Sequence, residues 1–171
     1  TSEPSEIAPR QVLINIIKQL DDENLKAIVA PELEFYLCEQ NLDPDLPLKT
    51  PVGKSGRRET GSRVFGIDAV NEFDAITDDI YDYCELMEIG VDTLVHESGP
   101  SQIEINLNHG DPLALADQAF MFKRAVRQVA LKHGIHATFM AKPYQGQPGS
   151  SMHIHQNLVN TQTEENLFSD E

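Results

Sequence analysis

Two pairs of side chains that could bind a metal ion each stand two residues apart in the sequence. Glu32 and Glu34 form one pair, and His153 and His155 form the other. In an extended strand, residues two apart point to the same face, so each pair can aim both heads into one cavity. The apolar residues beside them are expected to face a core: Leu33, Phe35, Met152 and Ile154.

Segment 96–104 adds Glu97 and Glu104, one on either side of a Ser-Gly-Pro turn. Their spacing allows both carboxylates to face one cavity but does not require it. Several carboxylates with one or two imidazoles favour Mg²⁺ or Mn²⁺, whereas a structural zinc usually recruits cysteine thiolates. Gln102 and Asn106 share a strand face with Glu104 and are candidates to hydrogen-bond it. From the residues alone, these groups could also be water-facing glutamates and ordinary strand histidines.

The elements that must position these side chains can be predicted from apolar periodicity and turn residues. Helices are expected at about 9–20, 69–88 and 111–134, and strands at about 26–39, 91–97, 101–107, 135–142 and 151–159. Segment 40–62, with three Pro and several Gly, is interpreted as an exposed loop. Antiparallel strands with helices packed on one face indicate an α+β domain.

The composition limits the possible partners. Net charge is −15, from 28 acidic and 13 basic residues, which argues against a nucleic-acid-binding protein because such proteins carry a basic surface. Most of the acidic residues are interpreted as solvated surface. Cys38 and Cys84 are too few to define a disulfide framework and suit a reduced, cytoplasmic protein. No apolar run approaches the length needed to cross a membrane, and no signal peptide is evident.

Four segments, taken in order, resemble the catalytic domain of the glutamine synthetase family. They are 31–37 (PELEFYL), 96–104 (HESGPSQIE), 137–143 (ATFMAKP) and 149–155 (GSSMHIH), and the resemblance runs from about Val12 to the C-terminus. It implies part of a curved antiparallel sheet that encloses an active site. It also implies an ATP-dependent ligase that phosphorylates the γ-carboxylate of glutamate and then transfers the acyl group to ammonia or an amine.

The resemblance also implies roles for individual residues. Glu34, Glu97 and Glu104 would hold the metal near the substrate carboxylate and the transferred phosphoryl group. Glu32 and His153 would hold the metal that bridges the ATP phosphates, with Mg²⁺ or Mn²⁺ as the ion. His155 would contact the nucleotide phosphates, and Gly149 would help to seat glutamate through its backbone. No catalytic acid or base is assigned.

Two positions depart from the ammonia-using enzymes and favour a polyamine as acceptor. Pro148 replaces the Asn that usually begins the Asn-Gly-Ser-Gly-Met-His motif, and Phe65 stands where a Tyr lies near the ammonium pocket. A phenyl ring cannot accept a hydrogen bond from ammonium. The sequence therefore resembles the γ-glutamylpolyamine synthetase branch, with putrescine or a similar amine as acceptor and ammonia as the alternative.

The chain begins with Thr1 and ends at Glu171, whereas family members have a small N-terminal domain and a long C-terminal half. We expect residues 1–171 to be a truncated catalytic domain that binds metal weakly and is inactive alone. The family implies a ring-shaped homo-oligomer for the full-length protein. Two other hypotheses are a non-catalytic assembly or sensing module and an unrelated metal hydrolase.

Overall fold

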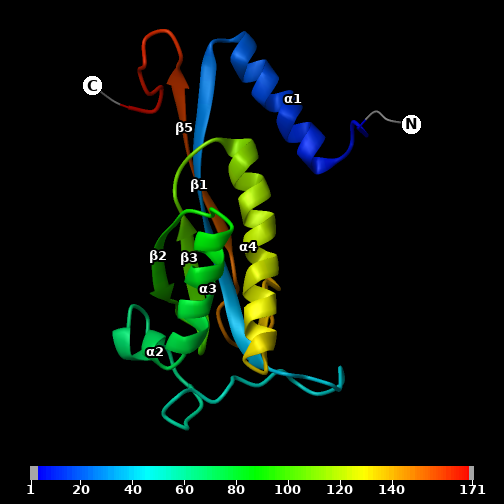
Figure 1. The fold of residues 1–171 in the computed structure, drawn as a ribbon, viewed down its shortest axis with the longest axis vertical. Coiled ribbons are helices and arrows are strands. Elements are labelled where there is room, and N and C mark those ends of the chain that lie inside the picture. The colour runs from blue at the N-terminus through cyan, green and yellow to red at the C-terminus, as the bar shows by residue number, and fades with distance from the viewer. Residues whose placement is uncertain (1–3, 170–171) are drawn as a thin grey trace.

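The computed structural model describes residues 4–169, and these residues form helices packed on an antiparallel sheet (Figure 1). In chain order the elements are α1 (Pro9–Asp22), β1 (Leu25–Glu39), α2 (Ile67–Asn71), α3 (Asp74–Leu86), β2 (Val91–His96), β3 (Gln102–Leu107), α4 (Pro112–Lys132), β4 (Ile135–Thr138) and β5 (Met152–Asn160). The architecture is α+β, as predicted. No helix within the described residues is long and apolar enough to cross a bilayer.

The 15-residue strand β1 is the centre of the sheet. The strand order is β2-β3-β1-β4, β5 also pairs with β1, and all these pairs are antiparallel. Strand β5 pairs with residues 25–33 of β1, and β4 pairs with residues 36–39. The two strands therefore lie end to end along one edge of β1, and the loop 139–151 that joins them passes close to Glu34.

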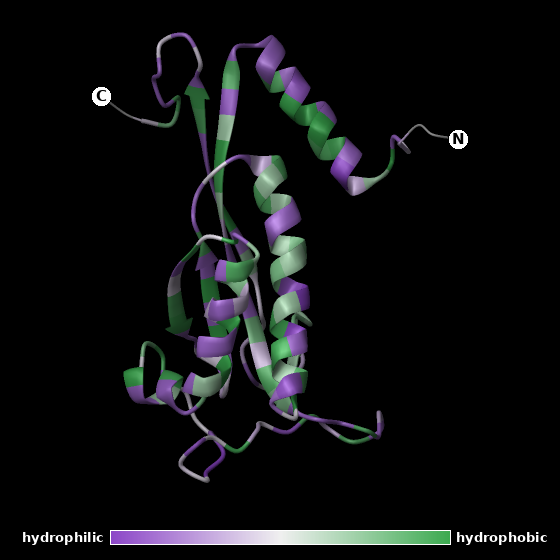
Figure 2. Ribbon diagram, in the orientation of Figure 1, coloured by the Kyte–Doolittle hydropathy of each residue, from purple (hydrophilic) through white to green (hydrophobic). Residues whose placement is uncertain are grey.

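The period of two along the strands separates a core face from a polar face. On the core face, alternate residues of β1 and β3 are fully or almost fully buried: Leu33, Phe35, Leu37, Ile103, Ile105 and Leu107. Helices α3 and α4 cover this face, and Figure 2 shows that both helices alternate between hydrophobic and hydrophilic stretches. Phe122 of α4 is completely buried and packs edge-on against Phe35, with ring centroids 6.5 Å apart.

Helix α4 begins as the sequence predicts. The Asp111 carboxylate accepts hydrogen bonds from the backbone N–H groups of Leu113 and Ala114, and Pro112 occupies the first turn. An aspartate cap satisfies amides that have no partner inside the helix, and proline tolerates the first turn because it has no amide to satisfy. The helix thus holds its apolar face against the sheet over 21 residues.

The prediction of one helix over 69–88 was wrong, because the structure has two helices with a break at Glu72 and Phe73. The backbone carbonyl of Glu72 accepts a hydrogen bond from Lys54 N (3.0 Å) in the preceding loop. Phe73 leaves the helical conformation (φ −126°, ψ 24°), and its ring is buried in the core. A contact distant in sequence therefore competes with helix continuation.

Two further expectations need correction at the strand ends. The strand predicted over 135–142 ends at Thr138, whose hydroxyl accepts a hydrogen bond from Met140 N and turns the chain. Met152 and Ile154 were expected in the core, but they are 47% and 52% exposed. Instead of packing in the closed core, they line an open groove between β5 and the first turns of α4.

Candidate metal and substrate site

The polar face of the sheet gathers most of the side chains singled out in the sequence. Glu34 is opposite Glu104 in the register of β1 and β3, and Glu32 is opposite His153 in the register of β1 and β5. Strand pairing thus brings together residues that are between 70 and 121 positions apart in the sequence. The two-residue spacing predicted which side chains share a face of a strand. The register of strand pairing determines which residues of the neighbouring strands lie beside them.

Three of these residues form a compact donor set. One ligand atom each of Glu32, Glu104 and His153 lies within 4.8 Å of the others, and Nδ1 of His153 is 3.5 Å from Glu32 Oε2. Asn106 donates weakly to Glu32 (3.4 Å), and its Oδ1 is buried without a hydrogen-bond partner among the described residues. Two carboxylates, an imidazole and an unsatisfied amide oxygen suit Mg²⁺ or Mn²⁺.

The carboxylates of this cluster repel one another when no cation is bound. Burial, followed by the nearby carboxylates of Glu32, Glu97 and Glu34, raises the pKa of Glu104 above its ordinary value. Glu104 is only 9% exposed. Carboxylates that are both buried and close to like charges favour the protonated form or a bound cation.

Glu34 lies beside the compact set and is held by hydrogen bonds. Its Oε2 accepts from Gln102 Nε2 (2.9 Å) and from Ser151 N (3.2 Å), and its Oε1 is bonded to the Ser151 hydroxyl. Gln102 and Asn106 do share a strand face with Glu104, as predicted. Their hydrogen bonds, however, go to Glu34 and Glu32 rather than to Glu104.

Glu97 follows the end of β2 and approaches the cluster from the turn that joins β2 to β3. Its Oε2 accepts from the N–H of Ser98 (3.1 Å), and its charge contributes to the raised pKa of Glu104. The same charge, after burial and Glu34, helps to raise the pKa of Tyr36 to about 12. Glu97 therefore lies at the edge of the acidic cluster, on the opposite side from β5.

His155 and Gly149 border the cluster. Nε2 of His155 is 3.0 Å from Glu32 Oε1, and its side chain is 69% exposed, so the ring is open to a ligand. Gly149 lies in loop 139–151, and a Cβ there would approach Ala141 O to 2.7 Å. Glycine is therefore required where the loop folds onto itself. Lys142 bonds the carbonyl of Gln147 within the same loop, which is a structural use.

A buried contact that no sequence pattern predicted joins Glu59 to His96. Glu59 belongs to segment 40–62, which was interpreted as a plain exposed loop, yet its side chain is only 7% exposed. Its Oε2 is 2.8 Å from Nε2 of His96 and accepts from Ser101 N at 2.6 Å. His96, for which no role was predicted, is 1% exposed and precedes Glu97. No spacing pattern relates residues 37 positions apart, so no sequence signal could have identified this contact.

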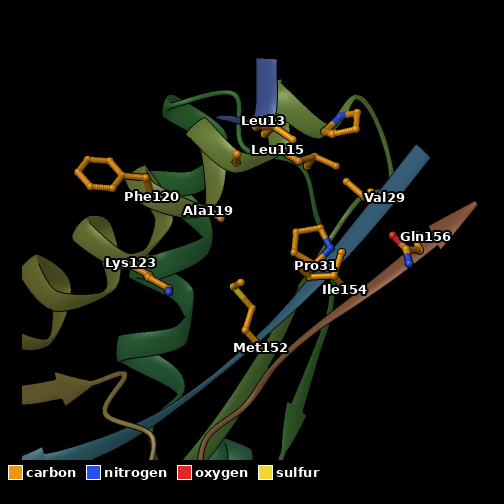
Figure 3. A pocket seen from close by; sticks show the side chains of 12 residues that line it. Leu13, Val29, Pro31, Leu115, Ala119, Phe120, Lys123, Met152, Ile154 and Gln156 are labelled. Carbon is orange, nitrogen blue, oxygen red and sulfur yellow. The ribbon is translucent and has the colours of Figure 1, made fainter. Parts of the chain in front are cut away.

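The opposite face of β1 and β5 carries a different feature. Val29, Pro31, Met152 and Ile154 line an apolar groove of about 470 Å³ beside the start of α4 (Figure 3). Met152 and Ile154 point into this groove, whereas His153 and His155 reach Glu32 on the other face. The groove and the acidic cluster are therefore separated by the sheet.

Comparison with known proteins agrees with this geometry. The family model for the glutamine synthetase catalytic domain matches residues 6–171. The chain is 42% identical over 169 residues to the γ-glutamylputrescine synthetase PuuA of Escherichia coli, covering 98% of this chain and 36% of that protein. It is 34% identical over 168 residues to the glutamine synthetase of Pyrococcus horikoshii, covering 98% and 35%.

A solved structure, the apo form of GmaS, superimposes with a TM-score of 0.82 at 25% identity, covering 99% of this chain and 38% of that one. The chain thus spans about a third of the length of the curated relatives that it matches. The family model, the ordered motifs and the shared fold lead to one conclusion: the chain belongs to the glutamine synthetase family.

Proposed function

We propose that the complete protein containing this segment is a cytoplasmic, homo-oligomeric, ATP-dependent ligase that joins the γ-carboxylate of glutamate to an amine. The observation that supports this most is the donor set of Glu32, Glu104 and His153 on the polar face of the sheet. Two anions, a carboxylate and a polyphosphate, must approach each other in this reaction. A divalent ion bound there would supply the positive charge that makes this approach possible.

We assign the residues in and around the donor set to different ligands. We assign Glu34, Glu97 and Glu104 to the metal nearest the glutamate carboxylate, and Glu32 and His153 to the metal nearest the nucleotide. His155, exposed beside Glu32, would contact the ATP phosphates. These assignments follow the family motifs, and the closeness of the carboxylates supports them.

Gly149 is assigned to glutamate binding through its backbone. The loop that carries it folds tightly onto Ala141, because Ser150 N donates to Ala141 O at 2.9 Å. Its peptide orientation is therefore fixed before substrate arrives, which reduces the entropy lost on binding. We expect the isolated 171-residue chain to bind metal weakly and to release no ADP.

We propose a diamine such as putrescine as the preferred acceptor. The 42% identity to a γ-glutamylputrescine synthetase, against 34% to a glutamine synthetase, supports this choice. Phe65 supports it as well, because its N–H bonds to His96 O (3.0 Å) beside Glu97 while its side chain is 75% exposed. An exposed ring, held by its backbone to the residue before Glu97, suits packing on the methylene groups of a diamine.

The test is ADP release by the complete protein with glutamate and Mg-ATP, comparing ammonia, putrescine and butylamine. We expect putrescine to give the highest kcat/KM. The His153→Ala variant should lose most activity, whereas His109→Ala, an exposed histidine after β3, serves as the matched control. Faster turnover with ammonia would assign the protein to the ammonia-using branch, and no turnover with any acceptor would favour a non-catalytic module.

A further inference from the structure

The side chain of Gln102 joins three segments of the site that are distant in sequence. Gln102 is 1% exposed and lies on β3 with its amide directed along the polar face of the sheet. Its Nε2 donates to Glu34 Oε2 at 2.9 Å and to the carbonyl of Gly149 at 3.0 Å. Its Oε1 accepts from the N–H of Gly99 at 2.8 Å. The proposed metal ligand, the turn after Glu97 and the substrate loop thus meet on one amide.

The chemistry of each partner determines whether the oxygen or the nitrogen of the Gln102 amide can face it. An N–H group can only donate and a carboxylate or carbonyl oxygen can only accept, so rotating the amide by half a turn would break all three contacts. Gln102 uses both its N–H groups and its oxygen in this arrangement. A buried amide with every hydrogen bond satisfied holds its neighbours in one geometry, because any displacement leaves a buried polar atom without a partner.

The loop that Gln102 holds has no regular structure of its own. Residues 139–151 contain no helix or strand and connect β4 to β5. The loop is tied to the sheet by Tyr36 OH, which donates to Pro148 O (2.8 Å), and by Ser151, which bonds Glu34. Among these ties, Gln102 binds both the Glu34 carboxylate and the Gly149 carbonyl, so it sets the position of one relative to the other.

We propose that Gln102 is a positioning residue that sets the affinity for glutamate by holding the Gly149 peptide against the Glu34 carboxylate. This inference deepens the proposed function and rests on it for the identity of the substrate. ATP is assigned to the region of Glu32, His153 and His155, which Gln102 does not contact. Loss of the Gln102 amide should therefore affect glutamate far more than ATP.

The experiment compares Gln102→Glu with the wild type in the complete protein. The substituted side chain keeps the length of glutamine and the acceptor oxygen that faces Gly99. As a carboxylate, however, it cannot donate a hydrogen bond to Glu34 or Gly149. We expect KM for glutamate to rise about tenfold or more, as for loss of a buried charge-assisted hydrogen bond, with KM for ATP changed by less than about twofold. Gln128→Glu, the same chemical change at an exposed position of α4, is the matched control.

A second variant and a second readout separate this role from folding and from activity. Gln102→Met is uncharged and of similar length, so it removes the hydrogen bonds without adding a carboxylate beside Glu34. In both variants, backbone hydrogen exchange should become faster in residues 142–151 and stay unchanged in α3 and α4. A residue that only fills space would change exchange throughout the domain and both KM values together.

The outcomes are distinct. Faster exchange in the loop with a selective rise in the glutamate KM supports the proposal. Unchanged loop exchange, or equal effects on both substrates, would overturn it. If the wild-type protein releases no ADP with any acceptor but the loop still loosens in both variants, the positioning contact stands and the proposed ligase function fails.

Discussion

Replacing Glu104 by glutamine should stabilise the metal-free protein and remove most of the stability that the protein gains from a divalent metal. Ligand atoms of Glu104 and Glu32 lie within 4.8 Å of each other. Two unit negative charges at that distance repel by about 1 kcal/mol in water and by about 3.5 kcal/mol at an effective dielectric constant of about 20. Glu104 is 9% exposed and the Glu32 side chain 23%, which places the pair between these limits. In the metal-free protein, we therefore expect Glu104→Gln to raise the free energy of unfolding by about 2 kcal/mol.

With metal, the stability advantage of the variant disappears. A cation at one hundred times its Kd stabilises the wild type by about 2.7 kcal/mol. If loss of the carboxylate weakens binding by about a hundredfold, the same cation concentration stabilises the variant by only about 0.4 kcal/mol. The metal-dependent part of the stability should therefore almost disappear in Glu104→Gln.

The assay is chemical denaturation of the complete protein in EDTA and in Mn²⁺ at about one hundred times the wild-type Kd, with direct Mn²⁺ titration as a check of affinity. Glu85→Gln makes the same change at an exposed position of α3 and should shift neither curve by more than about 0.5 kcal/mol. An equal Mn²⁺-dependent gain in Glu104→Gln and wild type would refute the assignment of Glu104 as a ligand. A less stable variant in EDTA would refute the argument from charge repulsion.

Three further predictions concern stability. Glu59→Gln should lower the free energy of unfolding by about 2 kcal/mol, measured in urea, because it removes a buried charge that faces His96; no change would mean that the contact is not formed in solution. Phe122→Ala should cost about 3 to 5 kcal/mol in the same assay, since the ring is completely buried; a loss below about 1 kcal/mol would contradict the core described above. Burial raises the pKa of Cys38 and of Cys84 from 9.0 to about 11. Because the folded state favours the neutral thiols, their contribution to stability is complete below pH 9.0 and is lost as the pH rises through about 11. At pH 8, a thiol reagent should modify both cysteines only after unfolding, and rapid modification of the native protein would show that they are accessible.

Local patterns in the sequence were sufficient for the elements with strong periodicity. Both ends of helix α1, helix α4 and strand β1 lie within two residues of their predicted bounds. In α4, the Asp111 cap and the apolar period act between near neighbours, so they can be recognised without the fold. The single helix predicted over 69–88 failed because a loop amide, that of Lys54, bonds the Glu72 carbonyl where the helix breaks.

The candidate site, like the fold, depends partly on local sequence patterns and partly on contacts between distant segments. The sequence determined which faces could carry carboxylates and imidazoles, because the period of a strand is local: motif 31–37 lies within β1, and residues 152–155 of the other motif begin β5. It also identified the family. Strand register alone decided that Glu104 would meet Glu32 and His153, since pairing between distant strands depends on how the whole sheet packs. The contacts of Gln102 and Glu59 have the same origin: each joins segments between 37 and 68 residues apart, and only the packed sheet brings them within hydrogen-bonding distance.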